Sequence, residues 1–93
     1  MAELKIKLFD LSTKIVLQLN NGVTDSEKLK LYALFKQSKN GDCNINEPSN
    51  FFNPIDHTKW AAWLSLKGKP KFDAMDEYSN LTAKLVDKYG TRK

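Results

Sequence analysis

The chain has 93 residues, of which 41% are hydrophobic and 28% are charged. This length predicts one domain over residues 1–93, and this composition is typical of a soluble globular protein and not of a disordered one. The most apolar stretch, Ile15 to Leu19, is too short to span a membrane, and charges interrupt the N-terminal segment where a signal peptide needs an apolar run. Because the single cysteine, Cys43, cannot form an intramolecular disulfide, we expect a reducing compartment, most simply the cytoplasm.

The formal net charge of +4 comes from the middle of the chain. Residues 28–71 carry eight lysines and three acidic side chains, an excess of five positive charges. This distribution is compatible with an anionic partner, and equally with an ordinary solvated surface.

Apolar residues predict two helices in the first half of the chain. In the first helix they recur at spacings of four, three, four and four: Leu4, Leu8, Leu11, Ile15 and Leu19. This amphipathic stripe excludes a strand, and Asn20-Asn21-Gly22 ends the helix. Thr24 and Glu27 have the spacing of a capping box, so they should open a second helix that runs to about Lys39.

The second half begins with a long irregular loop over residues 40–54, which is rich in Asn, Gly and Pro. A third helix is expected from Asp56 as N-cap to Gly68, with Trp60 and Trp63 more consistent with core than with ligand contacts. Pro70 suits the first turn of a fourth helix that Gly90 would end. No segment reads as a strand, so the sequence predicts a small all-α bundle.

Catalytic and metal-binding motifs are absent from the sequence. The only cysteine and histidine, Cys43 and His57, have no orienting partner, and neither a metal-ligand spacing nor a glycine-rich phosphate loop occurs. We therefore expect a binding protein and not an enzyme, with no catalytic residues, no metal and no cofactor.

One face of the second predicted helix interleaves aromatic rings with lysines. Its members are Lys28, Tyr32, Phe35, Lys36 and Lys39. Such a face suits a ligand with an aromatic base and phosphates, because the ring stacks and the ammonium meets the charge. On this helix alone, an ordinary amphipathic boundary with solvated lysines is the favoured interpretation.

Several motifs in order along residues 5–90 resemble those of acyl-CoA-binding proteins (diazepam-binding-inhibitor-like proteins). Residues 31–38, LYALFKQS, with Gly41-Asp42, resemble the signature LYxxYKQxxxGD. Pro48 matches the loop proline, and the segments KWAAW (59–63), LKG (66–68), AMDEY (74–78) and KYG (88–90) match later landmarks. Each motif is of moderate specificity, but their order and spacing together are specific.

The resemblance implies a four-helix, up-down-down-up bundle with a long loop between helices 2 and 3. It also implies non-catalytic binding, buffering and intracellular transport of medium- or long-chain fatty acyl-CoA esters. Tyr32 and Lys36 match positions that hold the phosphorylated ribose and adenine of coenzyme A. Lys59 matches a position that reaches the 3′-phosphate, and Tyr78 matches one that contacts the adenosine part. Leu29 matches a position that lines the acyl groove. A monomer that passes its ligand to acyl-CoA-using enzymes is the expected state.

Three residues depart from the family pattern. Phe35 replaces a common tyrosine, which keeps stacking on adenine but loses a hydroxyl. Leu17 stands where some members carry a ligand-contacting lysine. Lys28 stands where an apolar groove residue is common, so the path of the acyl chain or the length preference can differ. Residues 51–57 are also about one residue longer than in common members.

Two other functions compete with this interpretation. A nucleic-acid-binding helical module would use the basic middle of the chain, but Asp73, Asp76 and Glu77 dilute the charge near Tyr78. A helical protein-interaction module that has lost its ligand would not need the matching Tyr32, Lys36, Lys59 and Tyr78. We therefore expect acyl-CoA as the partner, with no nucleic acid and no stable membrane insertion.

Overall fold

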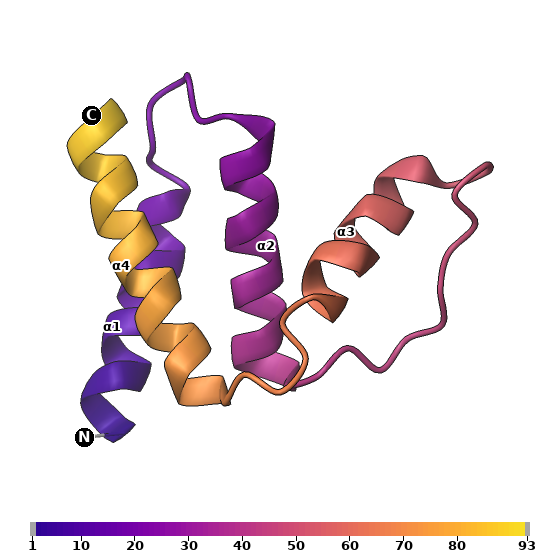
Figure 1. Ribbon diagram of the computed structural model, residues 1–93. Helices are drawn as coiled ribbons and strands as arrows, with labels where there is room; N and C mark the ends of the chain where they lie inside the picture. The colour runs from indigo at the N-terminus through magenta and orange to yellow at the C-terminus, as the bar shows by residue number, and fades with distance from the viewer. Residues whose placement is uncertain (1, 93) are drawn as a thin grey trace.

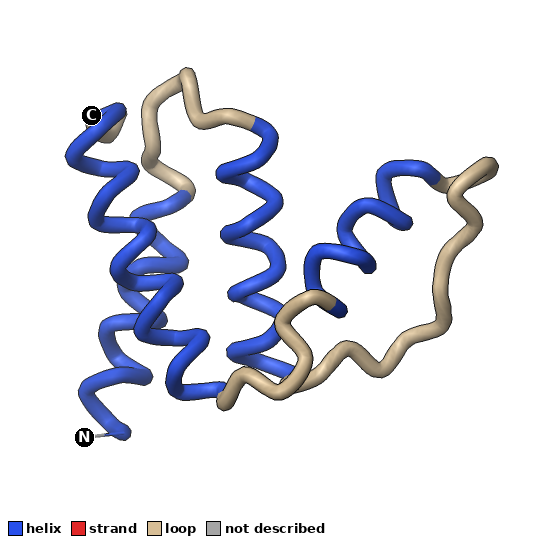
Figure 2. Tube along the Cα trace, in the orientation of Figure 1, coloured by secondary structure: helices blue, strands red, loops and turns tan. Residues whose placement is uncertain are grey.

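The computed structural model describes residues 2–92 and contains four helices in that range. They are α1 (Ala2–Val16), α2 (Asp25–Asn40), α3 (Pro54–Leu64) and α4 (Lys71–Tyr89). In Figure 1, α1 runs upward, α2 and α3 run downward and α4 runs upward again. Figure 2 shows the long loop between α2 and α3. The predicted all-α, up-down-down-up fold is confirmed. Across residues 2–92, no helix has both the length and the apolarity that crossing a membrane requires.

The capping box at the start of α2 is present as predicted. The Thr24 hydroxyl accepts a hydrogen bond from the Glu27 N–H at 3.1 Å, and the Glu27 carboxylate accepts one from the Thr24 N–H at 2.9 Å. Two otherwise unpaired backbone donors of the first turn are satisfied in this way. α2 ends at Gly41, whose φ of 78° lies in the region that favours glycine.

The boundaries of α3 and α4 differ from the predicted ones. Asp56 is not the N-cap of α3, because the helix begins two residues earlier at Pro54, with Asn53 as the N-cap residue. The fixed φ of proline suits the first helical position, and this local preference outweighs the capping preference of Asp56. α3 ends at Leu64, before Gly68, and Pro70 caps α4 from just outside its first turn. Gly90 ends α4 as predicted, with a φ of 75°.

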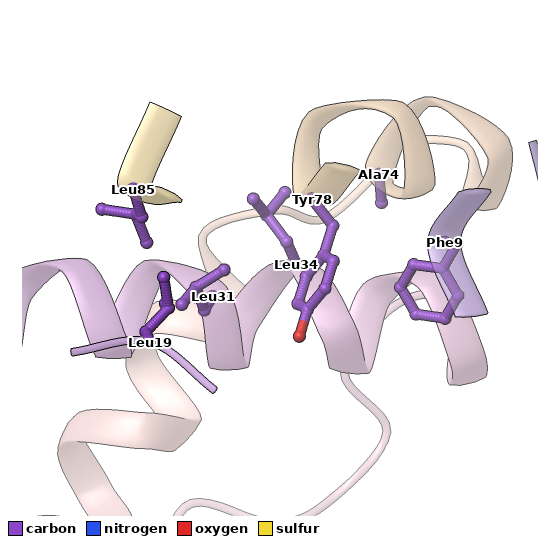
Figure 3. Close-up of a cluster of buried hydrophobic side chains, with 7 residues drawn as sticks. All are labelled: Phe9, Leu19, Leu31, Leu34, Ala74, Tyr78 and Leu85. Carbon is purple, nitrogen blue, oxygen red and sulfur yellow. The ribbon is translucent and has the colours of Figure 1, made fainter. Parts of the chain in front are cut away.

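The core lies between α1, α2 and α4. α4 packs against both α1 and α2, whereas α3 packs against the other side of α2 and leans away in Figure 1. The buried cluster drawn in Figure 3 contains Phe9, Leu19, Leu31, Leu34, Ala74, Tyr78 and Leu85. The molecule is flat, with extents of 38 × 33 × 15 Å, and α3 and the long loop lie at one side of it in Figure 1.

The leucines of the predicted stripe that lie on α1 do not face this core, whereas its last member, Leu19, lies beyond the end of α1 at Val16 and is buried in the core. Leu4, Leu8 and Leu11 are 56%, 46% and 53% exposed, whereas Phe9 is 1% exposed and Ser12 is also buried. An apolar stripe ordinarily faces the core of a globular protein. Here the Phe9 ring packs between two other rings, at 5.9 Å from Phe35 and 5.1 Å from Tyr78, so α1 is turned to bury the aromatic residue.

A polar junction fixes the end of α2 to the connection between α3 and α4. The buried Gln37 amide donates hydrogen bonds to the Asp42 carboxylate at 2.9 Å and to the Lys69 carbonyl at 2.8 Å. The Gly68 N–H donates to the same carboxylate at 2.8 Å, and these bonds lower the pKa of Asp42. The Gly-Asp pair found in the sequence therefore has a structural role.

Glu27 joins the start of α2 to the end of α4. Besides its bond to the Thr24 N–H, its carboxylate accepts a hydrogen bond from the Tyr89 hydroxyl at 2.8 Å and an ion pair from Lys88 at 3.1 Å. These interactions, led by the Thr24 backbone bond, lower the pKa of Glu27 from 4.5 to about 2.

This lowered pKa predicts a pH-dependent contribution of Glu27 to stability. Because the folded-state pKa is below the unfolded one, the contribution is present above about pH 4.5 and is lost as the pH falls towards about 2. We expect wild type to have a higher thermal midpoint than Glu27→Gln at neutral pH, and this difference to shrink between pH 4.5 and 2. Thermal unfolding of both proteins across this range measures it, and a pH-independent difference would contradict the assignment.

Candidate ligand-binding site

A groove of about 460 Å³ lies between the first half of α2 and the start of α3. It is lined by Asp25, Lys28, Leu29, Tyr32, Pro54, Ile55, Thr58 and Lys59. Of the predicted site residues, the structure therefore brings Lys28, Leu29, Tyr32 and Lys59 together. Those on α2 meet because they are neighbours on the helix surface, while Lys59 reaches them from the second turn of α3.

Two lysines are held over aromatic rings along this edge of α2. The Lys59 ammonium lies 5.4 Å from the centre of the Tyr32 ring, and the Lys36 ammonium lies 4.9 Å from the centre of the Trp63 ring. Lys36 follows Tyr32 by one helical turn but does not line the groove, so its contact with a ligand stays a prediction. Burial is the main cause that raises the pKa of the Tyr32 hydroxyl.

Phe35 and Tyr78 lie against the core and not in the groove. Phe35 is half-buried and packs on Phe9, and its ring centre is 6.3 Å from that of Tyr78. Tyr78 is 4% exposed, and its side chain extends from α4 across α2 in Figure 3. Burial raises the pKa of the Tyr78 hydroxyl. Contacts of these two rings with adenine or adenosine stay a prediction.

The long loop is attached to α3 by three side chains spaced three residues apart. His57 pairs with Glu47 at 2.8 Å, the Trp60 indole N–H donates to the Ile45 carbonyl at 3.1 Å, and the Trp63 indole N–H donates to the Gly41 carbonyl at 2.9 Å. Trp63 is 1% exposed and packs as core, as the sequence indicated, whereas Trp60 is only partly buried. These bonds give His57 a structural partner and hold α3 at its distance from α2.

Sequence reasoning missed the α3 side of the groove. Pro54, Ile55 and Thr58 line it, and Ile55 is 71% exposed. Ile55 precedes Lys59 by four residues, so the helical spacing could have placed both on the same face. An exposed aromatic pair, Phe51 and Phe52, lies just before this helix, with both backbone N–H groups donating to the Ser49 hydroxyl. The sequence predicted that α3 starts after Asp56, so Pro54 and Ile55 were not expected on this helix.

The groove combines apolar side chains with cations. Leu29, Pro54 and Ile55 offer apolar surface, while Lys28 and Lys59 offer positive charge, Lys59 from above the Tyr32 ring. Such a site can shelter an apolar chain and bind an anionic head group at the same time. Between residues 2 and 92, no group of three or more His, Cys, Asp or Glu side chains is placed to hold a metal ion.

Comparisons with known proteins agree with this geometry. A family model described as acyl CoA binding protein matches residues 7–82. The acyl-CoA-binding protein of Saccharomyces cerevisiae is 42% identical over 85 residues, which cover 91% of this chain and 97% of that protein. A solution structure of acyl coenzyme A binding protein from yeast, also 42% identical, has a TM-score of 0.71 and covers 90% of this chain and 96% of its own.

A crystal structure of Oryza sativa acyl-CoA-binding protein 2 is 30% identical, with a TM-score of 0.86 and coverage of 90% of both chains. The sequence and structural matches therefore extend over nearly the whole chain. The chain belongs to the acyl-CoA-binding protein family, a family of non-catalytic binding proteins, and the expectation that it is not an enzyme is confirmed.

Proposed function

We propose that this protein binds a medium- or long-chain fatty acyl-CoA in the groove between α2 and α3 and carries it without chemical change. The observation that supports this most directly is the position of the Lys59 ammonium over the Tyr32 ring, at the rim of an apolar groove. The acyl chain lies along Leu29, Pro54 and Ile55. The adenine and phosphates lie towards Tyr32, Lys36 and Lys59.

The two halves of the ligand contribute differently to binding. Each methylene removed from water contributes about 0.8 kcal/mol, so sheltering even half of a palmitoyl chain contributes several kcal/mol. The lysines add selectivity, because a free fatty acid lacks the phosphates that Lys36 and Lys59 would bind. The ester should therefore bind more tightly than either of its parts.

In the cell, this protein would act as a monomeric, cytoplasmic carrier and buffer. A bound acyl chain is withheld from membranes until an acyl-CoA-using enzyme takes it up. Lys28, which lines the groove where an apolar residue is common in the family, places a cation beside the acyl path. Its flexible stem can pack on an acyl chain while the ammonium stays in water.

Calorimetric titration with palmitoyl-CoA tests the proposal, with palmitate and coenzyme A as separate controls. We expect one ester per protein and much weaker binding of both fragments. A protein that binds neither the ester nor its fragments, and that the ester does not stabilise against heat, would overturn the proposed function. Binding of coenzyme A as tight as that of the ester would remove the acyl groove from the proposal.

A further inference from the structure

α1 presents an apolar surface that no residue between 2 and 92 covers. The surface, here called the α1 stripe, consists of Leu4, Leu8 and Leu11, each about half exposed. In Figure 1, α1 lies on the side of the bundle opposite α3. Their spacing of four and three residues puts them on one face of the helix. Neither the core nor the ligand groove uses these leucines.

Lysines flank the α1 stripe on the side away from α4. Lys7 lies three residues after Leu4 and four before Leu11, and Lys14 lies three residues after Leu11, so both adjoin the stripe. Both are exposed, and neither forms an ion pair with another residue in the range 2–92. On the side of the core, Lys5 pairs with Asp76 of α4 at 3.0 Å.

The acidic residues of α1 lie farther from the stripe than these lysines. Asp10 is spaced three residues after Lys7 and four before Lys14, which places it next to both lysines on the side away from the leucines. Glu3 is seven residues before Asp10 and therefore lies on the same side of the helix. Around the helix, the order is thus leucines, then lysines, then carboxylates.

This order fits the surface of an anionic bilayer better than a second copy of the chain. Interfacial helices place leucines towards the acyl chains and lysines at the level of the phosphates. A stable protein interface buries about 800 Å² on each partner, and three half-exposed leucines offer only a fraction of that area. Two copies would also bring the unpaired Lys7 and Lys14 of each chain near one another, which is unfavourable.

We propose that α1 is a peripheral membrane-binding helix that docks on bilayers containing anionic phospholipids. Leu4, Leu8 and Leu11 enter the boundary between head groups and acyl chains, while Lys7 and Lys14 pair with lipid phosphates. The proposal does not depend on the ligand groove, because that groove lies between α2 and α3 at the other edge of the molecule.

Co-sedimentation with large vesicles tests this proposal. The vesicles contain either phosphatidylcholine alone or phosphatidylcholine with about one-third phosphatidylserine. The test variant is Leu8→Gln/Leu11→Gln. Its matched control is Ile6→Gln/Leu17→Gln, which also replaces two exposed apolar side chains near α1, outside the stripe and without changing the charge. Circular dichroism and thermal midpoints establish that each variant is folded.

We expect wild type and the matched control to bind the anionic vesicles, and the stripe variant to bind them about tenfold more weakly. High salt and Lys7→Gln/Lys14→Gln should also weaken binding. Equal binding by the stripe variant and the control would overturn the proposal, as would a wild type that does not bind anionic vesicles.

Two further measurements test whether the exposed loop binds the membrane in place of α1, and whether a second copy of the chain covers the α1 stripe. If Phe51→Ser/Phe52→Ser abolishes vesicle binding while the stripe variant keeps it, the exposed loop and not α1 contacts the membrane, and the proposal is wrong. It is also wrong if light scattering shows a wild-type dimer that the stripe variant dissociates, because the stripe is then covered by a second copy.

Discussion

Replacing Lys59 by alanine is expected to weaken palmitoyl-CoA binding about 10- to 100-fold. A hydrogen bond between a charged group and its partner contributes about 1.5–3 kcal/mol, and about 1.4 kcal/mol corresponds to a tenfold change in affinity. The change also removes the cation that lies 5.4 Å from the Tyr32 ring centre. Lys36→Ala should weaken binding in the same direction, since Lys36 supplies the second cation on this edge.

Calorimetry on matched proteins measures the effect. Lys30→Ala is the control variant, because Lys30 is an exposed lysine of the same α2 helix that lies outside the groove and outside the face that interleaves rings with lysines. Both Lys59→Ala and the control should keep the helix content of wild type. If Lys59→Ala and Lys36→Ala bind palmitoyl-CoA like wild type, the assignment of the head-group site is wrong.

Palmitoyl-CoA that lacks its 3′-phosphate tests whether Lys59→Ala weakens binding through the lost interaction with that phosphate or through a changed shape of the site. Wild type should bind this analogue more weakly than the intact ester. In Lys59→Ala, the two ligands should bind with similar affinity, because the group that senses the phosphate is gone. A variant that still discriminates between the ligands as strongly as wild type would assign the 3′-phosphate to another residue.

Local signals in the sequence predicted α2 almost completely. Thr24 and Glu27 form the predicted capping box because the motif depends only on backbone groups within one turn. The lysine and tyrosine positions on α2 follow from helical spacing in the same way. The resemblance to the family added Lys59, whose approach to Tyr32 depends on how α3 packs and cannot be read from local periodicity.

Competition between neighbouring residues explains what the sequence did not predict. At the start of α3, the backbone preference of Pro54 outweighed the capping preference of Asp56, and the helix begins two residues early. Ile55 consequently lies on the first turn and lines the groove, and none of the sequence motifs indicated this position. The preferences of residues for the start of a helix correspond to small differences in free energy. A neighbouring residue with a competing preference can therefore shift the residue at which the helix begins.

The orientation of α1 is the clearest case in which packing outweighs periodicity. The leucine spacing identified the helix, but neither its end nor the face that it buries: α1 ends at Val16, before Leu19 and the predicted stop at Asn20-Asn21-Gly22. A periodic pattern reports which side chains share a face, and it contains no information on what shape the neighbouring helices leave open. In this protein that space lies beside Phe35 and Tyr78, and the ring of Phe9 fills it.

Phe9→Ala should therefore destabilise the protein strongly, while Leu8→Ala should do so only slightly. Phe9 is 1% exposed and contacts two other rings, so its loss leaves a cavity that costs about 3–5 kcal/mol. Small domains have a total stability of about 5–15 kcal/mol, so this is a large share. Leu8, its immediate neighbour, is 46% exposed, and its truncation should cost less than about 1 kcal/mol.

Urea unfolding of wild type and both variants, followed by circular dichroism, measures the two free energies. The unfolding midpoint of Phe9→Ala should fall by roughly 2 M urea, whereas that of Leu8→Ala should stay close to the wild-type value. Differences in helix propensity cannot explain such a contrast, because ordinary residues differ from alanine by less than about 0.7 kcal/mol and alanine favours the helix at both positions. If Leu8→Ala costs as much as Phe9→Ala, α1 buries its leucine stripe in solution, and that stripe is then not available to a membrane.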